Sequence, residues 1–268
     1  ISMYQESIER QEKAIKNQDK MSPNTKKLKN KVENHRNSIY NASKAYFSLG
    51  ALADQRATSL IQYLTEIAEL GPQKRPRPVK FWNQLSANET KEFLLQMITK
   101  ALDNYLMCII YSPGFSYEVV PRILFLFFDI GRHFVPEEDD KKNPSINLSI
   151  NQKTAVLQAM RESMLSKIDK VKASVWLNAI TQLTSRIEQP KSLEDVLFNL
   201  IKMSAIKYPE SSLWNLISIK NSTVSSRKPK WEPIMEYIKR DLPKQAQVRF
   251  EAIANQFASI SHHIIELC

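Results

Sequence analysis

Residues 88–111 read NETKEFLLQMITKALDNYLMCIIY, and this stretch decides the fold class. Apolar residues recur in it at steps of three and four, which is the spacing of one face of an α-helix. They are Phe93, Leu94, Met97, Ile98, Ala101, Leu102, Tyr105 and Ile109. The Ser112-Pro113-Gly114 sequence follows directly and is typical of a helix end. The stretch therefore predicts one long α-helix.

The residues before position 88 predict further amphipathic helices. Ile8 and Ile15 lie seven residues apart among charged residues, and a helical spacing resumes after the Ser22-Pro23-Asn24 break. Residues 57–70 predict another helix, which Gly71-Pro72 would end. Residues 73–86 contain prolines and basic residues without periodicity, as loops do. We therefore expect N-terminal helical repeats over 1–72, a Pro-rich basic linker over 73–87 and C-terminal helical repeats over 88–268.

The C-terminal part predicts a series of helices with short connections. Residues 121–134 are apolar nearly all round, which predicts a buried helix with Pro121 in its first turn, and residues 137–149 predict a polar loop. Periodic segments follow at about 151–171, 174–187, 192–207, 210–219, 231–241 and 244–267. Repeated amphipathic helices of this kind bury their faces against both neighbours. The predicted fold is all-α: an α-solenoid of stacked antiparallel helical hairpins with degenerate TPR-like or HEAT-like repeats.

Composition excludes several classes of protein. The chain has four glycines, at positions 50, 71, 114 and 131, so no glycine-rich loop is present to bind a nucleotide phosphate. Cys108 and Cys268 are too few for a disulfide framework and lack partners at metal-ligand spacing. The longest apolar run has six residues, over 123–128, so we expect no membrane segment. The chain starts with Ile1 and lacks a signal-peptide pattern, and we interpret it as part of a longer protein.

The net charge of +10 permits a nucleic-acid partner without requiring one. Basic clusters at 26–31, 74–78 and 227–230 lie in or beside predicted loops, which favours solvated loops over a nucleic-acid surface. The adjacent pair His262 and His263 points about 100° apart on a helix, which is poor geometry for a shared metal. The acidic run 137–140 lacks the spacing of a calcium loop. We expect no catalytic, cofactor-binding or metal-binding residues in this chain.

Three stretches resemble one kinase family. Residues 105–131 (YLMCIIYSPGFSYEVVPRILFLFFDIG), 176–190 (WLNAITQLTSRIEQP) and 196–227 (VLFNLIKMSAIKYPESSLWNLISIKNSTVSSR) resemble, in the same order, the FAT region of ATR-type checkpoint kinases, which are phosphatidylinositol-3-kinase-related kinases. The motif positions are Pro121, Arg122, Leu124, Asp129, Gln182, Leu183, Ser185, Arg186, Ile187, Tyr208, Pro209, Leu213, Trp214, Asn221, Ser222 and Arg227. Phe127 and Phe128 stand where that family has a Leu-Trp pair. The catalytic loop of that family is not present at Asp129-Ile130-Gly131-Arg132-His133, because Gly131 occupies the position of its Asp.

The resemblance implies a non-catalytic helical clamp that regulates a kinase domain following it in the same chain. It implies a nuclear serine/threonine kinase of the DNA-damage and replication-stress checkpoint, with an ATRIP-like partner protein, a homodimeric assembly, and ATP and Mg in the parent kinase. An ATM-type or other related kinase is the alternative within the family. A free-standing basic HEAT-like protein that binds nucleic acid or protein is the alternative outside it.

The simplest interpretation of the motif positions is that they have structural roles. Pro121 and its surface neighbour Arg122 would begin a helix, Arg186 would cap a helix or form a salt bridge within a repeat, and Trp214 would belong to the core. The functional interpretation places some motif positions on a surface that meets the kinase domain or a dimer partner. We take Pro121, Arg122, Asp129, Gln182, Ser185, Arg186, Tyr208, Pro209, Trp214 and Arg227 as the candidate positions.

Overall fold

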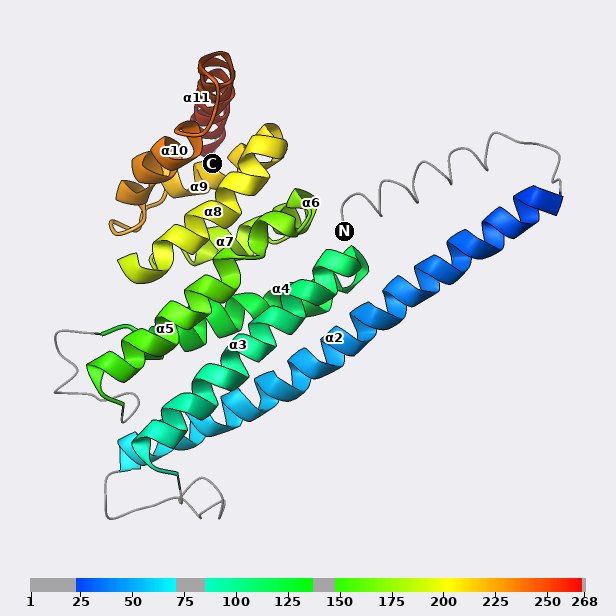
Figure 1. Ribbon diagram of the computed structural model, residues 1–268. Helices are drawn as coiled ribbons and strands as arrows, with labels where there is room; N and C mark the ends of the chain where they lie inside the picture. Colours follow the sequence, from blue (N-terminus) through cyan, green and yellow to red (C-terminus); the bar gives the residue numbers. More distant parts are fainter. Residues whose placement is uncertain (1–22, 71–84, 137–147, 267–268) are drawn as a thin grey trace.

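The computed structural model describes residues 23–70, 85–136 and 148–266, and these residues are helical with short connections (Figure 1). The first two helices, α2 (Pro23–Leu70) and α3 (Ala87–Tyr111), lie side by side and run in opposite directions. Helix α3 begins with a capping box, in which Ser86 and Glu89 satisfy each other's backbone amides. The long helix predicted over 88–111 is therefore confirmed.

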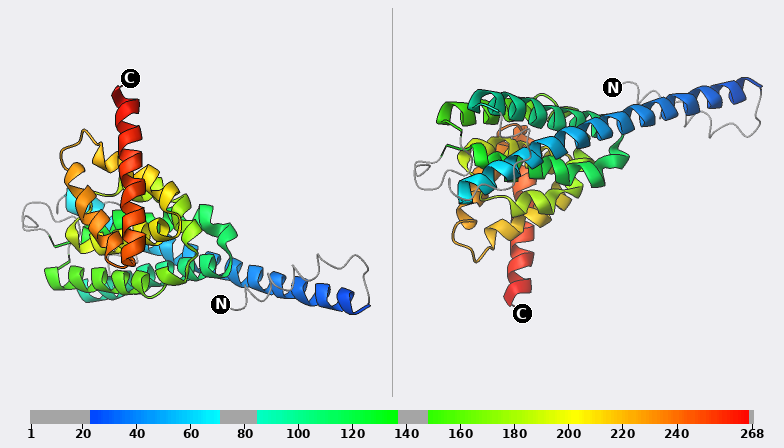
Figure 2. Two further views of the ribbon diagram at one scale, coloured as in Figure 1. Left: turned by 90° about the horizontal axis from the view of Figure 1, so that it is seen from above. Right: turned by 90° about the horizontal axis from the view of Figure 1, so that it is seen from below.

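Helix α2 differs from the sequence prediction. The two helices expected between residues 24 and 70 form one continuous helix of 48 residues, about 72 Å long at 1.5 Å per residue. The N-terminal part of α2 extends beyond the rest of the fold (Figures 1 and 2). The sequence contains no proline between Pro23 and Leu70, so nothing in it ends the helix. The basic cluster at 26–31 therefore lies in a helix rather than in a loop.

Gly50 lies where α2 passes closest to Tyr105 of α3. A Cβ atom added at Gly50 would be 2.7 Å from Cδ1 and 2.9 Å from Cε1 of the Tyr105 ring. Real Cβ atoms do not approach other atoms this closely. The glycine thus permits the close contact between the two helices, at the expense of helix propensity.

Gly50→Ala is expected to destabilise the protein by about 0.5–2 kcal/mol, although alanine favours a helix by about 1 kcal/mol, because overpacking outweighs that gain. The Tyr105 ring is buried, and its hydroxyl donates a hydrogen bond, so it has little freedom to move. Urea denaturation of both proteins measures the difference. Gly114→Ala is the control, since its Cβ would meet Ser112 Oγ only at 3.6 Å. A Gly50→Ala protein more stable than wild type would contradict the prediction.

The segment after α3 forms three short helical pieces in place of the single helix expected over 121–134. Helix α4 (Ser116–Leu124) is followed by a π-helical turn, η3 (Phe125–Ile130), and a 3₁₀ turn, η4 (Gly131–Phe134). Pro121 was predicted in a first turn but lies inside α4, which begins five residues earlier. Proline has no amide hydrogen, so the backbone hydrogen bond that it would donate is missing from this helix. The predicted burial is confirmed for most of this segment.

The remaining helices follow the predicted segments closely. They are α5 (Ile150–Leu165), α6 (Ala173–Asn178), α7 (Ile180–Ser185), α8 (Lys191–Lys207), α9 (Pro209–Lys220), α10 (Trp231–Lys239) and α11 (Lys244–Glu266), with 3₁₀ turns η2 (Pro113–Phe115), η5 (Ile168–Lys170) and η6 (Lys228–Lys230). The single helix expected over 174–187 is broken at Ala179, where neither proline nor glycine marks the break. The predicted acidic loop at 137–147 and the linker at 73–84 lie outside the described residues.

The helices pack in two rows. In one row α3 packs against α5, α5 against α8 and α8 against α10, whereas in the other α7 packs against α9 and α9 against α11. Hairpin partners such as α8 and α9 connect the rows. This stacking of one helical hairpin on the next is the arrangement of an α-solenoid. The predicted fold class is confirmed.

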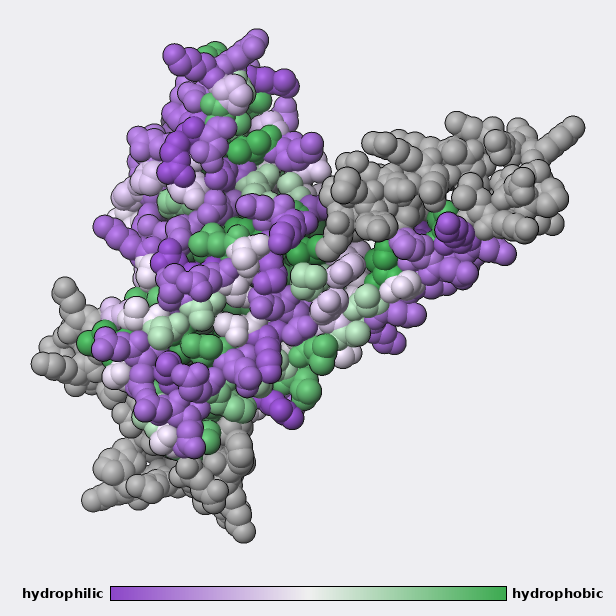
Figure 3. Space-filling model, in the orientation of Figure 1, coloured by the Kyte–Doolittle hydropathy of each residue, from purple (hydrophilic) through white to green (hydrophobic). Residues whose placement is uncertain are grey.

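A continuous apolar core runs through the rows, from Ala53 in α2 to Ala254 in α11. The face in Figure 3 is mostly hydrophilic, with small hydrophobic patches. Among the described helices, α3 is long and apolar enough to cross a membrane, but more than half of its most apolar window is buried in the fold. Burial raises the pKa of the Cys108 thiol to about 12, so this cysteine stays protonated at neutral pH.

His133 is expected to make the protein less stable as the pH falls below about 6.5, the ordinary pKa of histidine. Burial, and then the positive charge of Lys153, lower the pKa of His133 in the folded state. The unfolded chain therefore binds a proton at a higher pH than the folded protein does. The stability from neutral His133 is present above the unfolded pKa and is lost as the pH falls through the folded pKa.

Denaturation of wild type and His133→Gln at pH 7.5 and at a pH about one unit below the histidine pKa measures this effect. The loss of stability on acidification should be smaller in His133→Gln. Asn34→Gln, at an exposed position of α2, removes no titratable group; it is the control and should behave as wild type. Equal pH dependence of wild type and His133→Gln would show that His133 does not contribute.

Candidate functional site

The candidate positions do not meet in one cleft. The structure distributes them along the solenoid, where several connect one helical layer to the next. Arg122, Asp129, Arg186 and Arg227 each make a polar contact with a residue at least 43 positions away.

Arg122 holds α4 against α2. Its guanidinium donates two hydrogen bonds to Asp54, from Nε to Oδ2 at 2.8 Å and from Nη2 to Oδ1 at 2.7 Å. The Tyr105 hydroxyl donates to Asp54 Oδ2 at 3.0 Å, and the Thr58 hydroxyl donates to Oδ1 at 3.0 Å. The Arg122 guanidinium also lies 4.7 Å from the centre of the Phe125 ring. Arg122 is thus the partner of a buried carboxylate and not a surface residue without a role in the fold.

The electrostatics of this cluster agree with its geometry. The hydrogen bond to Asp54 raises the pKa of Arg122, so the guanidinium stays charged. Burial and the negative charge of Asp54 raise the pKa of the Tyr105 hydroxyl. Asp54 is only 3% exposed, and its two oxygens accept four hydrogen bonds. A buried carboxylate is tolerated only when it is paired and hydrogen-bonded in this way.

Asp54 was not among the predicted positions. The signal in the sequence is a charged residue on the apolar face of a helix that contains Ala53, Ala57 and Leu60. A charge at such a position indicates a buried ionic partner. The signal was missed because the predicted helix began at residue 57, which left Asp54 outside it.

Asp129 and Arg186 form a second contact, between η3 and α7. Arg186 Nη2 donates to Asp129 Oδ2 at 2.8 Å, and Arg186 Nη1 donates to the backbone carbonyl of Gln182 at 3.2 Å. Arg186 thus forms a salt bridge and binds a helix carbonyl, but the salt bridge joins two layers rather than lying within one repeat as the structural interpretation expected. Nearby, Arg132 Nε donates to the buried amide oxygen of Gln189 at 3.0 Å. Both contacts join the η3–η4 segment to the layer that follows it.

Arg227 connects the basic loop to α7. Its Nη2 donates to the backbone carbonyl of Thr184 at 2.8 Å, and its Nε is buried without a hydrogen-bond partner. Lys230 forms an ion pair with Glu194 of α8, and Lys228 is exposed. Two of the three cations at 227–230 are therefore used within the fold. The cluster is neither fully solvated nor a free basic surface.

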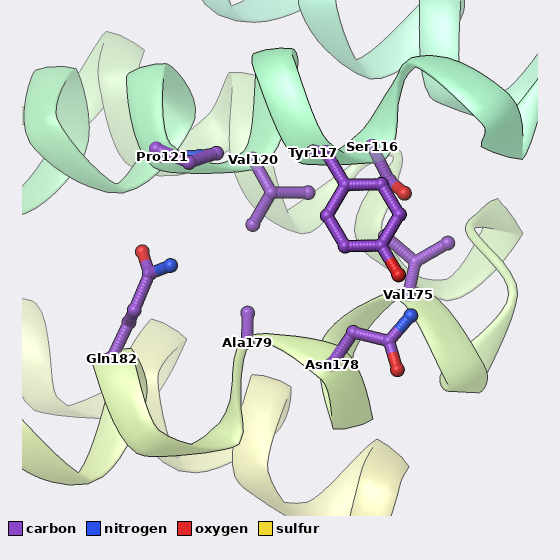
Figure 4. Close-up of a pocket in the computed structure, with 8 residues that line it drawn as sticks. All are labelled: Ser116, Tyr117, Val120, Pro121, Val175, Asn178, Ala179 and Gln182. Carbon is purple, nitrogen blue, oxygen red and sulfur yellow. The ribbon is translucent and has the colours of Figure 1, made fainter.

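Pro121 and Gln182 lie on opposite walls of a shallow pocket between α4 and the α6–α7 pair, together with the exposed Tyr117 (Figure 4). Its volume is about 40 Å³, far below the 300 Å³ or more of ordinary small-molecule sites. Ser185 is exposed and donates to the backbone carbonyl of Gln182 at 2.8 Å. The pocket brings two motif positions together but is too small for a cofactor.

Tyr208, Pro209 and Trp214 lie at the start of α9. Tyr208 is the N-cap residue and Pro209 occupies the first turn, where its missing amide hydrogen is not needed. Trp214 is 48% exposed and packs edge-to-face on Phe257 of α11, with ring centres 5.6 Å apart. The prediction that Trp214 belongs to the core is wrong, because its position on α9 faces outward beside α11.

Within residues 23–70, 85–136 and 148–266, no group of three or more His, Cys, Asp or Glu side chains could hold a metal ion. The His262 and His263 rings lie 6.0 Å apart. Arg122, Asp129, Arg186 and Arg227 hold successive layers of helices in register. The arrangement can present surfaces to other proteins and keep their relative positions.

Comparison with known proteins finds a family of helical repeats that part of this chain resembles. Residues 159–261 match the family model described as "Serine/threonine-protein kinase ATR-like, HEAT repeats". The chain is 24% identical over 194 residues to protein kinase rad3 of Schizosaccharomyces pombe, which covers 69% of this chain and 8% of that protein. It is 24% identical over 157 residues to the serine/threonine-protein kinase ATR of Oryza sativa, and 24% identical over 153 residues to that of Arabidopsis thaliana. Each of these two alignments covers 57% of this chain and 5% of the plant kinase.

The chain spans less than a tenth of the length of these relatives. No solved structure matches it. The matched segment begins within α5 and ends within α11, so it coincides with the stacked hairpins at the C-terminal end of the solenoid. The similarity thus relates the C-terminal hairpins of this chain to the HEAT repeats of ATR-like kinases.

Proposed function

We propose that this chain is a non-catalytic helical scaffold of an ATR-like serine/threonine protein kinase, which clamps the kinase domain and regulates it. The observation that carries the proposal is the coincidence of the ATR-like HEAT match with a solenoid whose layers are joined by ionic contacts. A rigid stacked array can hold a neighbouring domain and bias its conformational equilibrium. The catalytic residues, with ATP and Mg, would belong to the kinase domain after Cys268.

The finer assignments have different support. The position in the helical-repeat part of the kinase is supported by the family match, whereas the FAT region is supported by the three sequence stretches alone. Nuclear location, a role in the DNA-damage and replication-stress checkpoint, a homodimeric assembly and an ATRIP-like partner belong to the same proposal. They come from the resemblance of those stretches.

Cross-linking of the full-length parent kinase with a lysine-specific reagent tests the clamp directly. We expect cross-links between exposed lysines of the C-terminal layers, such as Lys191 and Lys228, and the kinase domain. Cross-links that join these lysines only to other helical repeats would overturn the clamp. The same data would distinguish a FAT position, adjacent to the kinase, from a more distant HEAT position.

A functional test uses Arg186→Ala in the full-length kinase. Loss of the contact with Asp129 should loosen one joint of the array and change stimulated kinase activity several-fold, with the KM for ATP unchanged. Lys91→Ala, which removes an exposed contact with Glu92 within α3, is the control. A change in the KM for ATP alone would contradict the proposed indirect role.

The net charge of +10 favours nucleic-acid binding as a second candidate. In that case the affinity of the chain for DNA should fall steeply as salt concentration rises, because phosphate contacts release counterions. An affinity that does not respond to salt would exclude this candidate. The use of Arg227 and Lys230 inside the fold weighs against it.

A further inference from the structure

Helices α9 and α11 form a seam with a pocket at one end. Along the seam Glu210 faces Arg249 at 3.7 Å, Trp214 contacts Phe257, and Asn221 donates to Ser261 Oγ at 2.7 Å. The residue numbers rise together on both helices, so the helices run in the same direction. The pocket opens where the α8–α9 turn meets the first turns of α11, and its volume is about 380 Å³.

The pocket has an apolar interior and a charged rim. Ile206, Leu242, Phe250 and Ile253 line its interior. Phe250 is buried and Ile206 is exposed, so the pocket has both a packed floor and an accessible edge. The volume of about 380 Å³ is near the lower limit of small-molecule sites, which begin at about 300 Å³. A pocket of this size accepts one or two large apolar side chains.

The apolar surface continues from the pocket along α11. Ile253, Phe257, Ile260 and Ile264 follow at steps of four, three and four, which places them on one face of the helix. Ile260 and Ile264 are exposed, and the exposed Trp214 lies beside Phe257. The C-terminal turns of α11 extend beyond the other helices (Figure 2). The pocket and this stripe, which share Ile253, are together called the α11 groove.

Charge indicates the kind of partner. Lys207 and Arg249 lie at the rim, and Lys244 is exposed nearly two turns before Phe250 on α11. The single acidic residue of the lining, Glu210, faces Arg249 and offsets only one of these cations. A second copy of the chain is a poor fit, because it would present the same excess of cations and would not supply the missing carboxylates. An acidic partner has no such repulsion.

We propose that the α11 groove binds an amphipathic helix of another protein, with an apolar stripe against α11 and acidic residues toward Lys207 and Arg249. Apolar anchors spaced along one face are how a helix lies in a groove of this kind. The 380 Å³ pocket would take the terminal anchor, and the carboxylates would fix the direction of the helix.

The test measures binding of a labelled peptide to the chain by fluorescence anisotropy. The peptide is a Glu-rich helix with leucines at the spacing of Ile253, Phe257, Ile260 and Ile264. One control peptide replaces each Glu with Lys, and a second has the same composition with the leucine stripe scrambled. We expect the acidic amphipathic peptide to bind at least about tenfold more tightly than either control, because both charge and apolar spacing are required.

Variants of the chain locate the site. Ile206→Glu should weaken binding about tenfold or more by placing a carboxylate at the mouth of the pocket, and Lys207→Glu should weaken it about threefold to tenfold. Val248→Glu, 68% exposed on α11 outside the pocket lining, and Lys228→Glu in η6 are the matched controls and should bind as wild type. Circular dichroism establishes that each variant is folded. If Ile206→Glu does not fold, Lys207→Glu still tests whether the pocket is the binding site.

Several results would overturn the proposal. They are equal binding of the acidic and basic peptides, no binding of the acidic peptide, and unchanged binding by both pocket variants. Sedimentation velocity tests whether a second copy of the chain occupies the groove. A wild-type dimer that Ile206→Glu converts to a monomer would show that it does. Peptide binding reduced by both pocket variants and by neither control would support the proposal.

Discussion

Asp54→Ala is expected to destabilise the protein by about 2–4 kcal/mol. Removal of one partner from a fully buried ion pair costs about 3–5 kcal/mol, and the lower range applies because the Arg122 side chain is 41% exposed and can regain water. The substitution also leaves the Tyr105 hydroxyl, in a 2% exposed residue, without its acceptor. Chemical denaturation measures the change in the free energy of unfolding.

The effect of Asp54→Ala should be concentrated at α2. Three of the four hydrogen bonds to Asp54 come from α3 and α4, so their loss weakens the attachment of α2 to the next layers. Amide hydrogen exchange should become faster around residues 50–61 before it does so in α8. Glu92→Ala, which removes an exposed ion pair with Lys91, is the control and should change stability by less than about 1 kcal/mol.

A double-mutant cycle of Asp54→Ala and Arg122→Ala separates the pair from its surroundings. The double variant should be less destabilised than the sum of the two single variants, since the second substitution removes the charge left unpaired by the first. Strict additivity would show that the two side chains do not stabilise each other, and the interpretation of Arg122 as the partner of Asp54 would then fail.

Phe127→Ala is expected to destabilise the protein by about 3–5 kcal/mol, the usual result of truncating a buried aromatic side chain. Phe127 is fully buried in the π-helical turn η3 and packs edge-to-face on Phe128, with ring centres 5.0 Å apart. Thermal and urea unfolding both report the change.

Two further variants test the interpretation of Phe127. Phe127→Leu keeps most of the buried volume and should cost less than about 2 kcal/mol. Tyr117→Ala, at a position 80% exposed on the preceding helix, should change stability by no more than about 0.5 kcal/mol. A Phe127→Ala protein within 1 kcal/mol of wild type would indicate that η3 repacks, contrary to the burial on which the prediction depends.

Resemblance and structure contribute differently to the motif positions. The resemblance to a kinase family identified four charged residues as motif positions: Arg122, Asp129, Arg186 and Arg227. The structure shows that each of them makes a contact between layers. The resemblance did not select Asp54, the carboxylate that Arg122 requires. Nor did it predict that Trp214 is half exposed beside α11, in the groove for which a partner helix is proposed.

The sequence by itself determined the class of the fold and most helix boundaries. Helical spacing of apolar residues and the turn residues between them are local signals, which is why α3, α8 and α9 begin and end within two residues of their expected positions. The low glycine content and the absence of glycine-rich loops likewise followed from composition alone.

The tertiary structure alone decided the joints between layers. Asp54 and Arg122 are 68 residues apart, and Asp129 and Arg186 are 57 apart, so no periodicity in the sequence relates them. The close approach of α2 to the Tyr105 ring at Gly50, and the burial of Phe127 in the π-helical turn, likewise exist only in the folded chain. Local propensity selects helices, whereas contacts between distant residues select how the helices are joined, because burial and ion pairing exist only after the layers have packed.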